Sequence, residues 1–209
     1  MSADPDPSPR ENMRVAAIVL AAGRSSRMAP RNKLLESIGG EPIIRRVAAN
    51  ALASGARPVF VVIGHEAAGI AAALAGLDVT TIANPAYAEG LSTSLRAGVK
   101  ALPAEIDGAL VCLGDMPEVE GSVLGALMVA FTGASAICVP VHHGRRGNPI
   151  LWSRSYFAEM MGLAGDTGAR KLLAQHHECV IEVEVGSNGI FADVDTPSDL
   201  ERLKVGSAS

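Results

Sequence analysis

Hydrophobic and polar positions alternate in blocks along the chain from residue 14 onward. Short runs of Val, Ile, Leu and Ala, typical of buried strands, alternate with longer amphipathic stretches typical of helices. Strands are expected at residues 15–20, 58–63, 79–82, 109–113, 135–139, 150–152 and 180–185. Helices are expected at residues 42–54, 66–75 and 92–102. Three more are expected: one that begins at about residue 120, one that ends at about residue 176 and one that begins at residue 197.

Polar residues mark several of the expected helix starts. Ser92 lies where a hydroxyl would cap a helix, and Thr196 with Asp199 forms a pattern like a capping box. Asp166 and Arg170 lie four residues apart, where an ion pair within one helix is the simplest interpretation.

Regular alternation of strands and helices indicates an α/β fold with right-handed crossovers. The composition agrees, because 48% of the residues are hydrophobic and only 3% aromatic, which suits a parallel sheet covered on both faces. We expect a three-layer α/β/α arrangement with a mostly parallel sheet, forming a single domain over residues 14–205. Residues 1–13 are rich in Pro and Asp, and we expect a disordered tail there.

Charge and cysteine content bear on the kind of function and on the compartment of the protein. The net charge of −4 argues against a long nucleic-acid groove, and no apolar stretch is long enough to span a membrane. The three cysteines show neither zinc spacing nor a disulfide framework, which favours a reducing, cytoplasmic location. Cys112 and Cys138 lie in apolar runs and are predicted to be buried.

The most informative segment follows the first strand, with the sequence LAAGRSSRM at residues 20–28 and a lysine at position 33. Small residues at 21–23 let the backbone approach a ligand, and backbone N–H groups can form a nest for an anion. Arg27 and Lys33 would neutralise the charge of a polyphosphate. A solvated basic loop is the alternative for each cation taken singly.

Two common nucleotide motifs are absent. The pattern Gly-x-Gly-x-x-Gly does not occur, and the second strand ends in Gly64-His65 rather than in an acidic residue. No Walker lysine follows a glycine either. Simple NAD binding is therefore disfavoured.

Carboxylates follow two other segments that we expect near the same sheet edge. Asp115 ends a buried strand, where an unpaired carboxylate is costly and Mg²⁺ is a natural partner. Asp193 and Asp195 would face one side if they lay on a strand, and one could complete the metal site. Capping of the next turn or helix is the alternative for all three. In open α/β sheets, ligands bind beyond the carboxyl ends of the strands.

Two further polar segments are candidates for ligand contacts. Residues 90–94 place three hydroxyls at a helix start, where free N–H donors could hold a base edge or a ribose, although ordinary capping competes. The basic turn at residues 142–146 could touch a phosphorylated acceptor, with a solvated turn as the alternative.

Together these signals resemble nucleotidyltransferases with a GT-A-like, Rossmann-like fold, and more narrowly the molybdenum cofactor cytidylyltransferases. The first motif gives only the superfamily, whereas the later motifs in this order are more specific. The resemblance covers nearly all of residues 15–203. Its motifs are Leu20-Ala-Ala-Gly-x-Ser-x-Arg-Met28 with Lys33-Leu-Leu, Gly90-x-Ser-x-Ser-Leu-Arg-Ala-Gly98, Leu113-Gly-Asp-Met-Pro117, Arg146-Gly-Asn-Pro149, Gly165-Asp-x-Gly-Ala-Arg170 and Asp193-Val-Asp-Thr-Pro197.

The resemblance implies transfer of CMP from CTP to the terminal phosphate of molybdopterin, with Mg²⁺ as cofactor and release of pyrophosphate. A chaperone of molybdoenzymes is a further candidate partner, and no nucleic acid or membrane is expected. Arg27, Lys33 and Asp115 would be catalytic, and Asp115 with Asp195 would bind the metal. The nucleotide would be held by Leu20, Ala21, Ala22, Gly23, Arg24, Ser25, Gly90, Ser94 and Asp115.

Two positions refine this expectation. Ala22 stands where related guanylyltransferases carry Gly, and its methyl group would favour CTP over GTP. Ala29-Pro30 replaces a usual Gly and would stiffen the loop. A cytidylyl- or uridylyltransferase acting on a sugar or polyol phosphate, and a non-catalytic nucleotide-binding chaperone, are the alternatives.

Overall fold

The computed structural model describes residues 13–25, 28, 31–166 and 169–206. The expected tail, apart from Met13, lies outside these residues, as do Arg27 and the Ala29-Pro30 pair. Among the described residues, none of the helices is both long and apolar enough to cross a bilayer.

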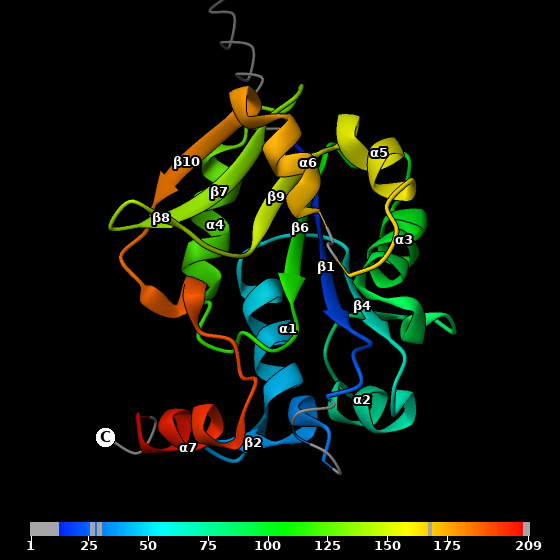
Figure 1. The fold of residues 1–209 in the computed structure, drawn as a ribbon, viewed down its shortest axis with the longest axis vertical. Helices are drawn as coiled ribbons and strands as arrows, with labels where there is room; N and C mark the ends of the chain where they lie inside the picture. The colour runs from blue at the N-terminus through cyan, green and yellow to red at the C-terminus, as the bar shows by residue number, and fades with distance from the viewer. Residues whose placement is uncertain (1–12, 26–27, 29–30, 167–168, 207–209) are drawn as a thin grey trace, which may run out of the picture.

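The chain builds a mixed sheet in which parallel pairing dominates (Figure 1). The main strand order is β10-β7-β9-β6-β1-β4-β5, and β8 pairs with β7. The strands are β1 (Val15–Ala21), β4 (Val59–Ile63), β5 (Thr80–Ala83), β6 (Gly108–Leu113), β7 (Ile137–His142), β8 (Arg145–Arg146), β9 (Ile150–Ser153) and β10 (Val180–Glu184), with a separate hairpin of β2 (Ser37–Ile38) and β3 (Glu41–Pro42).

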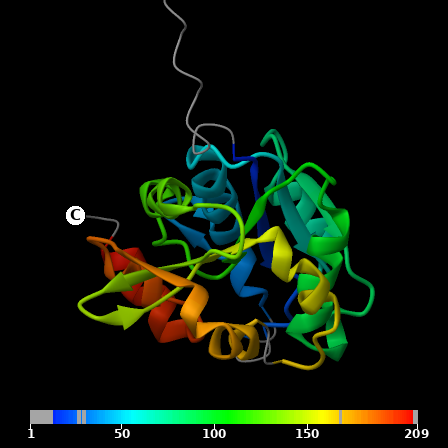
Figure 2. The same cartoon turned by 90° about the horizontal axis from the view of Figure 1, so that it is seen from above.

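Helices cover both faces of this sheet (Figure 2). They are α1 (Ile43–Ala53), α2 (Ala67–Ala73), α3 (Leu91–Ala101), α4 (Gly121–Ala130), α5 (Phe157–Met161), α6 (Arg170–Gln175) and α7 (Pro197–Gly206). The prediction of a three-layer α/β fold with a mostly parallel sheet is confirmed.

Two hydrophobic cores lie on opposite faces of the sheet, and β1 contributes to both. Val15, Ala17, Val19 and Ala21 pack with α1 and α4, whereas Ile18 and Leu20 pack with α3 and α5. This alternation is the period of two that a strand imposes. Because β1 is buried on both faces, its whole sequence is apolar.

The carboxyl-terminal half departs most from expectation. Strand β9 runs antiparallel to both of its neighbours, β6 and β7, and so interrupts the parallel order. Helix α5 was not expected, and the expected basic turn at 142–146 forms a small hairpin of β7 and β8. Residues 193–195 form no strand, so the argument that Asp193 and Asp195 share a strand face is wrong.

Candidate functional site

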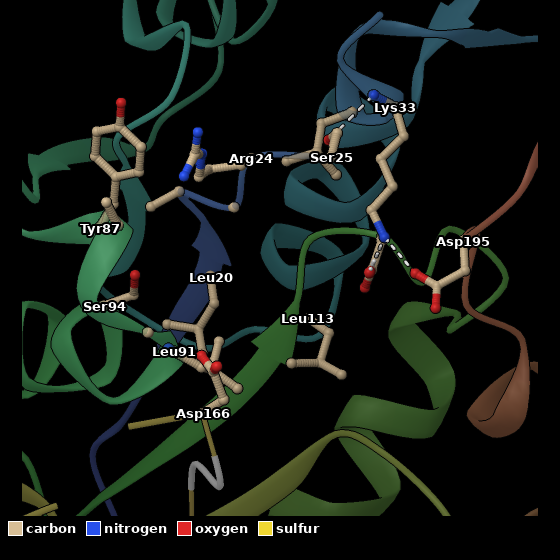
Figure 3. A pocket seen from close by; sticks show the side chains of 16 residues that line it. Leu20, Arg24, Ser25, Lys33, Tyr87, Leu91, Ser94, Leu113, Asp166 and Asp195 are labelled. Carbon is tan, nitrogen blue, oxygen red and sulfur yellow. Dashed lines mark hydrogen bonds and ion pairs between the residues drawn. The ribbon is translucent and has the colours of Figure 1, made fainter. Parts of the chain in front are cut away.

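A cavity of about 520 Å³ opens where β1 and β6 end (Figure 3). Most of the residues that the sequence nominated line it, namely Leu20, Ala22, Gly23, Arg24, Ser25, Lys33, Gly90, Ser94, Asp115 and Asp195. The side chain of Ala21 instead packs with α1 and α4, on the other face of the sheet from Leu20 and Ala22, so it does not line the cavity. The structure therefore brings together segments that are far apart in the sequence.

Polar contacts within the loop after β1 set the backbone position of Lys33. Ser25 adopts a positive φ of 49°, and its hydroxyl donates to Asn32 Oδ1 at 3.2 Å. The backbone N–H of Lys33 donates to Ser25 Oγ at 3.3 Å, and that of Leu34 donates to Asn32 Oδ1 at 3.1 Å. Asn32 was missed by the sequence reasoning, although Asn before a helical turn is a common capping signal.

The ammonium of Lys33 lies between two carboxylates. Its Nζ atom is 2.7 Å from Asp115 Oδ2 and 2.8 Å from Asp195 Oδ1, as the dashed lines in Figure 3 indicate. Burial alone would lower the pKa of Lys33, but the charge of Asp115 and hydrogen bonds to both carboxylates outweigh it and raise this pKa above 10.5. Lys33 is therefore a cation at neutral pH.

Main-chain bonds hold the two carboxylates close together. The backbone N–H of Val194 donates to the carbonyl of Asp115 at 2.9 Å, which ties the segment before α7 to the end of β6. On the other side, the backbone N–H of Gly114 donates to the carbonyl of Leu20 at 3.0 Å. A Cβ at position 114 would meet that carbonyl oxygen at 2.7 Å, so the close approach of β6 to β1 requires glycine.

The predicted capping box at the start of α7 is confirmed, and it also positions Asp195. The Asp199 carboxylate accepts from the backbone N–H and the hydroxyl of Thr196 at 2.9 and 2.7 Å. It also accepts from the backbone N–H of Asp195 at 3.3 Å. Asp193, in contrast, is exposed and does not line the cavity. The structure thus places Asp195, not Asp193, beside Asp115.

The carboxylate pair fits a divalent metal ion that also binds phosphate. Asp115 and Asp195 both contact the ammonium of Lys33, so the two carboxylates can reach a single cation. Among the described residues, no cluster of three or more His, Cys, Asp or Glu side chains could hold a metal alone. Mg²⁺ commonly takes one or two carboxylates and fills its remaining positions with phosphate oxygens and water.

The other side of the cavity is formed by the start of α3. Gly90 precedes the helix with a φ of 114°, and a Cβ there would meet Asp166 Oδ1 at 2.7 Å. Asp166 accepts a hydrogen bond from the backbone N–H of Leu91 at 3.1 Å, so it caps α3 from a distant loop. The expected cap by Ser92 is wrong, since the N-cap position is held by Gly90, which has no side chain. The expected helical pair of Asp166 and Arg170 is also wrong, because α6 begins only at Arg170.

Ser94 and the half-buried Tyr87 lie together on this side, away from Lys33 and Asp195 (Figure 3). Ser94 is buried in the first turns of α3 and accepts a hydrogen bond from Asn84. Neither Asn84 nor Tyr87 was among the nominated residues. The only local signal was the dipeptide Asn84-Pro85, which indicates a loop.

A second cavity, of about 730 Å³, adjoins the first, and the two share Leu20, Leu91, Leu113 and Asp166. Much of its lining is apolar, including Leu95, Val111, Ile150 and Trp152. Arg170, Lys171 and Asn148 add polar groups to the same lining.

The basic turn at residues 142–146 lines neither cavity. Arg146 pairs with Glu182 at 2.7 Å, and the Arg145 guanidinium lies 4.4 Å from the centre of the Phe191 ring. Arg146 thus contacts strand β10 and Arg145 packs on the turn before α7. Both arginines are exposed, which agrees with the alternative of a solvated turn.

Comparisons with known proteins show the family of the chain. The family model described as the MobA-like NTP transferase domain matches residues 17–180. The chain is 31% identical to the molybdenum cofactor cytidylyltransferase of Escherichia coli K12 over 191 residues, which is 91% of this chain and 95% of that protein.

Solved structures share the fold of the chain. The crystal structure of Rv0371c from Mycobacterium tuberculosis H37Rv aligns with a TM-score of 0.82 at 28% identity, covering 92% of this chain and 98% of that one. Rv0371c has also been solved in complex with manganese. A CMP:2-keto-3-deoxy-manno-octonic acid synthetase complexed with CTP shares the fold, with a TM-score of 0.73 at 17% identity over 93% of this chain and 98% of that one.

Proposed function

The chain belongs to the MobA-like NTP transferase family, and on that premise we propose that it transfers CMP from CTP to the terminal phosphate of molybdopterin and releases pyrophosphate. The observation that carries the proposal is the meeting of Lys33, Asp115 and Asp195 beside the loop that follows β1. A cation and two carboxylates next to the exposed Gly23 and Arg24 suit a metal-bound triphosphate.

The orientation of the nucleotide follows from the two sides of the cavity. The backbone N–H groups of the exposed Gly23 and Arg24 and of Ser25 would bind the phosphates, and the charge of Arg24 would add to this. Lys33 would contact the end of the triphosphate. The base would then lie toward Ser94 and Tyr87. The buried methyl group of Ala22 forms part of the cavity lining, which supports a preference for CTP over GTP.

Catalysis would come from positioning and charge neutralisation. An oxygen of the acceptor phosphate attacks the α-phosphorus in line, the bond between the α-phosphorus and the bridging oxygen breaks, and that oxygen leaves with pyrophosphate. Lys33 would stabilise the negative charge that grows on the leaving group. A Mg²⁺ ion held by Asp115 and Asp195 would neutralise and orient the phosphates when bound.

The second cavity supports a heterocyclic acceptor. Trp152, Ile150 and Leu95 offer apolar surface, while Arg170 and Lys171 offer positive charge for a phosphate. The hydroxyl groups of a sugar or polyol phosphate would find few polar partners along this mostly apolar lining. The free thiols of Cys112, Cys138 and Cys179 agree with a cytoplasmic location.

The test is pyrophosphate release by the purified chain with Mg²⁺, each nucleoside triphosphate in turn and one of three acceptors. We expect release with CTP and molybdopterin, and little with ribitol phosphate or glucose 1-phosphate. Release with a sugar or polyol phosphate alone would move the assignment to that class. Tight CTP binding without release for any acceptor would favour a nucleotide-binding chaperone.

A further inference from the structure

Asn84 is the centre of a buried hydrogen-bond network at the base side of the cavity. Its Nδ2 atom lies 2.9 Å from Thr93 Oγ1 and 3.0 Å from Ser94 Oγ, and its Oδ1 atom lies 3.1 Å from the backbone N of Ala86. Asn84, Thr93 and Ser94 are each 5% exposed. The network is therefore almost entirely buried.

One of these bonds fixes the direction of all the others. The backbone N–H of Ala86 can only donate, so the atom of Asn84 that faces it must be the carbonyl oxygen. The amide NH₂ of Asn84 must then face Thr93 and Ser94, and both hydroxyls must accept from it. The amide orientation follows from the surrounding donors and acceptors.

The hydroxyl protons of Thr93 and Ser94 differ in whether they have an acceptor in the protein. The Thr93 hydroxyl donates to the carbonyl of Gly90 at 2.8 Å or to that of Ala86 at 3.1 Å. For the Ser94 hydroxyl proton, the described protein atoms provide no hydrogen-bond acceptor, and Ser94 lines the cavity. The proton is thus free to point into the cavity as a buried donor.

We propose that Asn84 is a positioning residue that holds the Ser94 hydroxyl as a hydrogen-bond donor to the nucleotide base, and that this polarity selects cytosine. The inference rests on the proposed binding of a nucleotide in this cavity. Cytosine presents an acceptor at N3, where uracil presents an N–H donor. The Ser94 hydroxyl proton finds an acceptor in N3 of cytosine, whereas against the N–H of uracil it is left without one.

The decisive variant is Asn84→Asp, which keeps the shape but replaces the NH₂ group by an oxygen. The carboxylate still accepts from the backbone N–H of Ala86 and now also accepts from Ser94, so the hydroxyl turns its lone pairs toward the cavity. We expect the ratio of CTP to UTP affinity to fall by about tenfold or more, as expected for one buried hydrogen bond left unmade. Affinities for both nucleotides are measured by calorimetry at pH 8 on the full chain.

Two further variants separate polarity from general damage. Thr93→Val removes the other hydroxyl of the network and leaves the Ser94 proton free, so the ratio should stay within about twofold of the wild-type value. Ser94→Ala should lower the ratio by itself, and adding Asn84→Asp to it should produce no further change, because the two residues act as one unit.

The outcomes are distinct from those of the proposed function. Equal losses of CTP and UTP affinity in Asn84→Asp, or equal affinities in the wild-type chain, would overturn the inference. A wild-type preference for CTP that depends on Asn84 would support it even if no acceptor released pyrophosphate. In that case the proposed transfer reaction would fail while the base recognition held.

Discussion

Replacing Lys33 by Met removes one charge from the centre of the candidate site and keeps most of the side-chain volume. In the structure, this ammonium makes two charge-assisted hydrogen bonds, at 2.7 and 2.8 Å. Such bonds make a net contribution to stability of about 1.5–3 kcal/mol each when they are well buried. Because the three side chains are 14–34% exposed, solvent screens part of this gain.

The expected loss of stability is therefore modest, at about 1–2 kcal/mol, or roughly 2–8 °C in Tm for a chain of this size. The expected loss of turnover is much larger, about 100- to 1,000-fold in kcat, as for removal of one preorganised donor to a developing negative charge. Differential scanning fluorimetry measures the first quantity and a pyrophosphate-release assay the second.

Lys100→Met is the matched control, since Lys100 is an exposed lysine in the last turn of α3. It should change neither quantity appreciably. Turnover near the wild-type level in Lys33→Met would refute the role of Lys33 at the leaving group. If the Lys33→Met chain lost turnover only because it was unfolded at the assay temperature, the expected direct effect on kcat would be refuted.

Two further predictions concern other parts of the molecule. The hydrogen bond from Thr196 is the main cause that lowers the pKa of Asp199 below 3.8, so its stabilisation is present above pH 3.8 and disappears as pH falls through the lowered value. Asp199→Ala should therefore lower the Tm by about 2–4 °C at pH 7, and by less under acid conditions, in thermal melts. Burial raises the pKa of Cys112 to about 12 and that of Cys138 to about 11, so a thiol reagent at pH 8 should modify Cys179 first. Rapid modification of all three thiols in the native chain would contradict the burial argument.

The sequence predicts the amino-terminal half well because its signals are local. Strand β1 is buried on both faces, and its uninterrupted apolar run predicts its bounds to within one residue. The Pro42 and Gly55 signals likewise bracket α1 closely. The cavity at the carboxyl ends of the strands follows from this topology, which is why most of the nominated residues meet there.

Long-range contacts explain what the sequence could not predict. Strand β9 lies antiparallel between β6 and β7, and its own residues carry no signal of its neighbours. Asp195 faces Lys33 because the main chain of Val194 bonds to Asp115, not because the segment is a strand. Asn84 gains its role only when the fold brings the start of α3 against the loop after β5.

We propose that a metal-bound nucleotide docks at Asp115, together with Lys33 and Asp195. Calorimetric titration of CTP with and without Mg²⁺, on Asp115→Asn and on the exposed Asp193→Asn, tests it most directly. We expect Asp115→Asn to lose about tenfold or more of the Mg²⁺-dependent affinity, while Asp193→Asn keeps it. Full Mg²⁺-dependent CTP binding by Asp115→Asn would show that Asp115 does not hold the metal.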